Sequence, residues 1–86
     1  MKLYTKYEIE DALENSGKYG LSALVAMQSQ MLKHENFLYE QYRFYAEELE
    51  GVSYAPLQAA LYSDFIQQHG KNMRIMDSNI KAAQAA

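Results

Sequence analysis

Residues 38–66 read LYEQYRFYAEELEGVSYAPLQAALYSDFI, and this stretch decides the fold of the chain. Apolar residues recur at spacings of three and four in both of its outer parts, which is typical of amphipathic helices. Between these parts, Gly51 favours a helix end, Ser53 favours an N-cap and Pro56 favours the first turn of a new helix. The stretch therefore predicts two antiparallel helices joined by a turn around residues 50–55.

The same spacings continue outward from this turn on both sides. The upstream seam consists of Leu21, Leu24, Gln28, Met31, Glu35, Leu38, Tyr42, Tyr45 and Leu49. The downstream seam consists of Ala59, Tyr62, Ile66, His69, Met73, Met76, Ile80 and Ala83. When the chain folds back on itself the seams pair in register, with Leu38 opposite Ile66 and Glu35 opposite His69. The pattern predicts an antiparallel helical hairpin with coiled-coil-like packing.

We expect a single all-α domain over residues 1–86, because a chain of this length holds one domain at most. A short helix is predicted at about 5–15, and long helices at about 21–50 and 56–82. A two-helix hairpin alone buries little of its surface. The sequence therefore predicts either a three-helix bundle, with the short helix packed on the hairpin, or a hairpin that forms an oligomer.

Local signals refine these boundaries. Thr5 followed by Glu8 predicts a capping box at the start of the short helix. Gly17 is well suited to be its C-cap. Gly70 lies inside the last helix and costs about 1 kcal/mol relative to alanine. Because the seam passes through Gly70 without a phase slip, we expect this helix to be continuous.

Composition excludes several classes of function. The chain has no cysteine, which excludes disulfides, zinc–thiolate sites and thiol catalysis. Its formal net charge of −3 argues against non-specific nucleic-acid binding, which needs a basic face. No stretch has the length of a signal-peptide core or of a membrane span. We therefore expect a cytoplasmic protein, although export by a non-classical route leaves no recognisable signal.

Glu35 and His69 are the residues with the greatest potential for chemistry. They could act as an acid–base pair or as part of a metal site, but the Glu-x-x-His pattern of di-iron bundles is absent, since Leu38 stands three residues after Glu35. We favour a buried polar pair that fixes the helix register. No catalytic, cofactor-binding or metal-binding residue is predicted, and we expect that the protein is not an enzyme.

A second apolar surface lies outside the predicted seam and is rich in aromatic residues. It consists of Phe37, Tyr39, Phe44, Leu61, Phe65 and Ile75. The short helix could fold over it and complete a three-helix bundle. Alternatively, it could be an interface with a partner protein or a second copy, because aromatic residues are enriched at interfaces. The sequence leaves both possibilities open, since the short helix cannot cover the full length of the hairpin.

These observations favour a small interaction or assembly protein that uses its second apolar face. In size and hairpin architecture the chain is similar to bacterial secretion-needle subunits, to their small helical chaperones, and to many small phage and plasmid proteins. Needle subunits typically carry Pro-x-x-Pro between their helices, whereas this chain has Ala55-Pro56. The alternative is a small inhibitor or adaptor of the kind that mobile elements encode, which binds a host protein.

Overall fold

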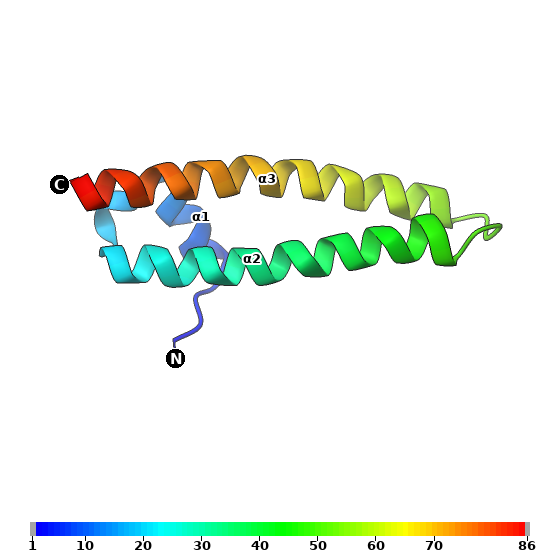
Figure 1. Ribbon diagram of the computed structural model, residues 1–86, viewed down its shortest axis with the longest axis horizontal. Coiled ribbons are helices and arrows are strands. Elements are labelled where there is room, and N and C mark those ends of the chain that lie inside the picture. Colours follow the sequence, from blue (N-terminus) through cyan, green and yellow to red (C-terminus); the bar gives the residue numbers. More distant parts are fainter. Residues whose placement is uncertain (1, 86) are drawn as a thin grey trace.

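The computed structural model describes residues 2–85, and every regular element in this range is helical. The elements are α1 (Lys6–Glu14), the 3-10 turn η1 (Ser16–Lys18), α2 (Leu21–Arg43), the π-helical turn η2 (Phe44–Glu48) and α3 (Ala55–Ala85). The all-α fold class is therefore confirmed. Figure 1 shows α2 and α3 side by side and antiparallel along the length of the molecule, which is 53 Å.

The predicted seam forms the contact between α2 and α3. Six of its residues are buried: Leu24, Met31, Leu38, Ala59, Met76 and Ile80. Near the turn, Tyr45 stacks on Tyr62 with ring centroids 5.8 Å apart. Farther along, the His69 ring contacts the backbone carbonyl of Met31. Each contact lies one seam position from the predicted pairing, because a seam side chain packs between residues of the facing helix.

The hairpin turn agrees with the prediction at Gly51 and differs from it at Ser53. Gly51 has a φ of +87°, a left-handed conformation that glycine adopts without a Cβ clash. The preceding turn is π-helical, with the Leu49 amide donating to the Phe44 carbonyl at 3.0 Å. The next helix begins at Ala55, so Ser53 lies outside its N-cap position and that prediction was wrong.

α3 runs without interruption through Gly70, as the unbroken seam predicted. A Cβ added at Gly70 would meet the Arg74 guanidinium at 3.9 Å, which is an ordinary van der Waals distance. The glycine is therefore not required by a close approach of another element. Within residues 2–85, neither α3 nor any shorter helix combines the length and apolarity needed to cross a bilayer.

α1 has the predicted beginning but a different end. The Thr5 hydroxyl accepts from the Glu8 amide at 3.1 Å, and the Glu8 carboxylate accepts from the Thr5 amide at 3.0 Å, which confirms the capping box. The C-cap is Asn15, and Gly17 lies within η1, so the predicted C-cap was wrong. Asp11 fixes the end, because its backbone and side-chain oxygens accept from both Asn15 nitrogens at 2.7 and 2.9 Å.

Candidate protein-binding groove

α1 packs in cis on one half of the hairpin and is held at both ends. At its start, the Gln30 amide exchanges two hydrogen bonds with the Tyr4 backbone, at 2.7 and 3.0 Å. At its end, the Asn79 amide of α3 donates to the carbonyls of Ala12 and Leu13 at 3.1 and 3.3 Å. α1 therefore crosses from α2 to α3, and these contacts answer whether the short helix packs on its own hairpin.

α1 is too short to complete a bundle along the whole hairpin. Its nine residues span about 14 Å, against roughly 45 Å for the 31 residues of α3. The core that it completes consists of Ala12, Leu24, Met27, Met31, Met76 and Ile80. Figure 1 shows α1 beside the half of the hairpin away from the turn, with no third helix beside the other half. We call residues 36–68, which include the turn, the open half.

An apolar groove leads from α1 into the open half. It has a volume of about 720 Å³ and is lined by all three helices. Its lining includes Tyr4 and Ile9 near α1, His34, Phe37 and Leu38 from α2, and Tyr62, Phe65 and His69 from α3. Beyond the start of α1, the floor of the groove consists of aromatic and aliphatic side chains, and no helix lies over them.

Aromatic rings connect the two long helices across the open half. Phe44 meets Tyr45 edge to face at 5.2 Å, and Tyr62 meets Phe65 in the same way at 5.8 Å. The Tyr45–Tyr62 stack joins these two pairs across the seam. Phe37 and Phe65 nevertheless remain 46% and 52% exposed. Large aromatic rings are thus held in fixed places by their neighbours while much of their area faces solvent.

The predicted interface residues do not all lie on this groove. Phe37 and Phe65 line it, and Phe44 and Leu61 follow on the same sides of their helices at spacings of seven and four residues. Ile75 is exposed but belongs to the half that carries α1 and is not part of the groove lining. The predicted surface is therefore split between the two halves of the hairpin.

Tyr39 lies on the opposite shoulder of α2, because two residues along a helix turn the side chain by about 200° from Phe37. It continues an exposed row with Val25 and Leu32 at spacings of seven. Val25 and Leu32 were not among the predicted interface residues, although the sequence shows their spacing of seven residues. That row is narrower than the groove surface, since one helix alone supplies it.

The expected Glu35–His69 pair does not form among the described residues 2–85. His69 instead lies 2.8 Å from the Met31 carbonyl through its Nε2, which must carry the proton because a carbonyl accepts. Neither Glu35 nor His69 is fully buried. The reason is rotational: Glu35 and His34 flank the seam on opposite sides, and His69 turns toward His34, with ring centroids 5.4 Å apart.

His34 occupies the groove wall between α1 and the aromatic residues. Its ring stacks on Phe37 at a centroid distance of 5.9 Å. Desolvation lowers the pKa of His34, and electrostatic interactions with His69 and with the Lys6 ammonium lower it further.

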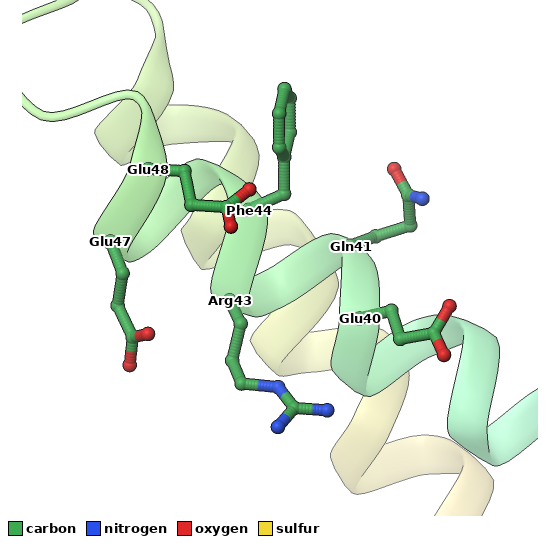
Figure 2. A pocket seen from close by; sticks show the side chains of 6 residues that line it. All are labelled: Glu40, Gln41, Arg43, Phe44, Glu47 and Glu48. Atoms are coloured by element: carbon green, nitrogen blue, oxygen red, sulfur yellow. The ribbon is translucent and has the colours of Figure 1, made fainter.

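The outer surface of the open half is acidic. It carries exposed Glu40, Glu47, Glu48, Glu50 and Asp64, with Arg43 as its basic residue. Figure 2 shows that Phe44 and Gln41 point to one side of the helix and that Arg43 and Glu47 point to the other. Glu40 and Glu48 lie one turn before and one turn after Phe44, so acidic groups border the aromatic surface.

The described residues offer no arrangement for metal chemistry. Within residues 2–85, no group of three or more His, Asp or Glu side chains could hold a metal ion. In the same range, no buried side-chain nitrogen or oxygen lacks a hydrogen-bond partner. The groove instead combines an apolar floor, aromatic rings that contact one another and a charged border, which are features common at protein interfaces.

Comparison of the chain with protein-family models, with characterised proteins and with solved structures found no significant match in any of the three.

Proposed function

We propose that this protein is a small, non-enzymatic helical interaction protein that binds a partner through the aromatic groove of its open half. The observation that carries the proposal is the incomplete bundle. α1 completes a three-helix core over one half of the hairpin. In the other half, four apolar side chains remain about half exposed: Phe37, Phe44, Leu61 and Phe65. Full burial of one such side chain from a fully exposed state contributes about 1.5–3 kcal/mol, so a partner that covers the remaining exposed half of four of them gains appreciable free energy.

The surface has the composition of an interface and is prepared in advance. Tyrosine and phenylalanine are enriched in protein–protein interfaces relative to the rest of the surface. The edge-to-face and stacked contacts among Phe44, Tyr45, Tyr62 and Phe65 restrain the rings before binding. Restraint of side chains lowers the entropy cost of association. These features support a role as an assembly subunit or a chaperone-like protein.

One observation favours the alternative of a small inhibitor or adaptor. Because α1 packs in cis, one chain presents one open half, which is the geometry of a one-to-one complex. An assembly subunit would instead need complementary surfaces that repeat along the assembly. The row of Val25, Leu32 and Tyr39 on the other shoulder is a candidate for such a second surface.

Site-specific photocrosslinking in the source cell tests the proposal. A benzoyl-phenylalanine at position 44 replaces a half-exposed aromatic residue by another aromatic residue and should preserve the fold. We expect a discrete crosslinked species from position 44, and none from the same group at position 71, where Lys71 is exposed on α3 in the half that carries α1. The mass of the crosslinked species shows whether the partner is a second copy of this chain or another protein. Absence of a crosslink at position 44, or the same products from both positions, would refute the proposal.

A further inference from the structure

We infer that the occupant of the open half is a basic amphipathic helix, which lies in the same groove as α1 and extends the three-helix core toward the turn. This inference rests on the proposed function and names the chemistry of its partner. Two independent features carry it: the shape of a groove that already accommodates one helix, and the sign of the charge around its empty part.

α1 itself shows how a helix packs on this hairpin. Ile9 and Leu13 of α1 pack against α2 and α3, and the same groove continues past the start of α1 to Phe37 and Phe65. Both long helices supply exposed apolar residues to the surface there, with Phe37 and Phe44 from α2 and Leu61 and Phe65 from α3. A second amphipathic helix placed in the groove would bury its apolar stripe as α1 does.

The charged residues are distributed unevenly along the chain. Within residues 36–68, Glu40, Glu47, Glu48, Glu50 and Asp64 stand against the single basic residue Arg43. The rest of the chain is balanced, with seven basic and six acidic residues. The acidic excess is therefore concentrated on the half that lacks a third helix.

The ion pairs of the molecule leave this excess uncompensated. Among residues 2–85 the salt bridges join Lys2 to Glu8, Lys6 to Glu10, Lys18 to Asp11 and Lys81 to Asp77. All four lie outside the open half. The acidic groups of the open half thus have no basic partner within 4.0 Å in the described chain, and a ligand with Lys or Arg on its flanks supplies one.

Acidic residues are neighbours of the exposed phenylalanines on both long helices. Glu40 and Glu48 flank Phe44 by one helical turn on either side, and Asp64 directly precedes Phe65. An amphipathic helix places its apolar stripe in the middle and its charged residues along both edges. Its apolar stripe would contact the phenylalanines while its basic edges face the carboxylates.

The same charges disfavour the other occupants. A second copy docked through its own open half would bring two acidic borders together. A neighbouring α1 would add Glu8, Glu10, Asp11 and Glu14 against Lys6. An anionic membrane surface would be repelled for the same reason. Of the candidates, a basic partner helix alone turns the acidic border into an attraction.

Binding of synthetic helical peptides to the full chain tests the inference. The probe is a 14-residue Leu/Lys peptide with an amphipathic 3.6-residue period, used at concentrations at which it is monomeric. The matched controls are a Leu/Glu peptide of the same period and a scrambled Leu/Lys peptide. We expect the periodic Leu/Lys peptide to bind, to lose at least tenfold in affinity between 50 and 300 mM salt, and to bind at least tenfold more tightly than either control.

Paired variants locate the site. Phe44→Ser should abolish binding of the Leu/Lys peptide, and Glu40→Gln with Glu48→Gln should weaken it about tenfold at 50 mM salt. Ile75→Ser and Asp77→Asn are matched controls in the half that carries α1, and both should leave the affinity unchanged. Helical circular dichroism confirms that each variant remains folded.

The outcomes separate this inference from the proposed function. If the Leu/Glu or scrambled peptide binds as tightly, or if the periodic Leu/Lys peptide does not bind, the inference is wrong, whereas a discrete crosslink from position 44 still supports the proposed function. If light scattering shows a dimer that Phe44→Ser dissociates, a second copy is the occupant, which also overturns the inference alone. Loss of both the crosslink and the peptide binding refutes both.

Discussion

At the residue scale, position on the seam proved easier to predict than the partner of each polar side chain. Spacing assigns Glu35 and His69 to the inner side of their helices, because each residue turns the helix by about 100°. It does not reveal that His69 reaches a backbone carbonyl, that of Met31, which every residue type supplies equally. The predicted seam did not include His34. A step of 100° from Glu35 nevertheless places His34 on the side of α2 that faces the groove.

The environment of His34 leads to a prediction on pH. Its pKa is lowered from 6.5 in the folded state, so below about that pH the unfolded chain binds more protons than the folded chain. Stability therefore rises with pH across this region and is lost as pH falls through the lowered pKa. The groups that face His34 are His69 of α3 and Lys6 of α1, with the Lys6–Glu10 ion pair close by.

Urea denaturation of the native chain and of His34→Gln between pH 5 and pH 7.5 measures this contribution. We expect the native chain to lose more stability than the variant as the pH is lowered. Parallel pH profiles for the two proteins would show that His34 does not contribute to the pH dependence. His34→Gln is chosen because glutamine keeps a polar side chain of similar length without a titrating group in this range.

At the scale of elements, some helix boundaries followed the local signals in the sequence, whereas those expected from Gly17 and Ser53 and the placement of α1 did not. The capping box at Thr5 and the turn at Gly51 are decided by neighbouring residues and were predicted. The position of α1 depends on Gln30 and Asn79, which are 26 and 67 residues from the backbone atoms that they hold. No periodicity encodes such single long-range hydrogen bonds.

Two glycine substitutions should have opposite effects. Gly70→Ala lies in a helix interior where the new methyl group meets only the Arg74 guanidinium at an ordinary van der Waals distance, so we expect it to stabilise the fold by about 1 kcal/mol. Gly51→Ala forces a Cβ into a positive-φ conformation and should destabilise by about 1 kcal/mol. Denaturant unfolding measures both changes. A loss of stability in Gly70→Ala would show that the helix is not continuous there.

The contact of Asn79 with α1 gives a second prediction for an element. Asn79→Ala removes the donor to two carbonyls at the end of α1 and should cost about 0.5–1.5 kcal/mol. Faster hydrogen exchange confined to residues 6–14 would accompany the loss. Ser78→Ala, an exposed neighbour on α3, serves as the control. If both variants behave alike, Asn79 does not hold α1 in place.

At the scale of the whole molecule, the fold was predictable and the site was predictable in part. Each of the two seams is a local pattern in the sequence, and together they predict two helices. The seams pair because the chain reverses its direction at the turn. The second apolar surface was also visible, and Phe37, Phe44, Leu61 and Phe65 lie on the open half as one surface. Tyr39 and Ile75 could not be separated from them, because that division depends on where α1 covers the hairpin.

Unequal cover of the two halves predicts unequal dynamics. Six of the buried side chains lie in the half that carries α1, whereas the open half buries Leu38, Ala55 and Ala59, two of which are small. Local opening is easier where fewer apolar contacts are broken. Amide hydrogen exchange should therefore be slower in residues 76–80 of α3 than in residues 60–66. Equal protection along α3 would contradict this prediction.

The last turn of α3 lies at the tip of the molecule opposite the hairpin turn, and the long axis between the tips is 53 Å (Figure 1). A tether attached at this end would hold the aromatic half at the far, free tip of a nearly rod-shaped body. A surface coated with the protein in this orientation would display its binding groove to the solution. Immobilisation through the hairpin turn would instead bury the groove against the support.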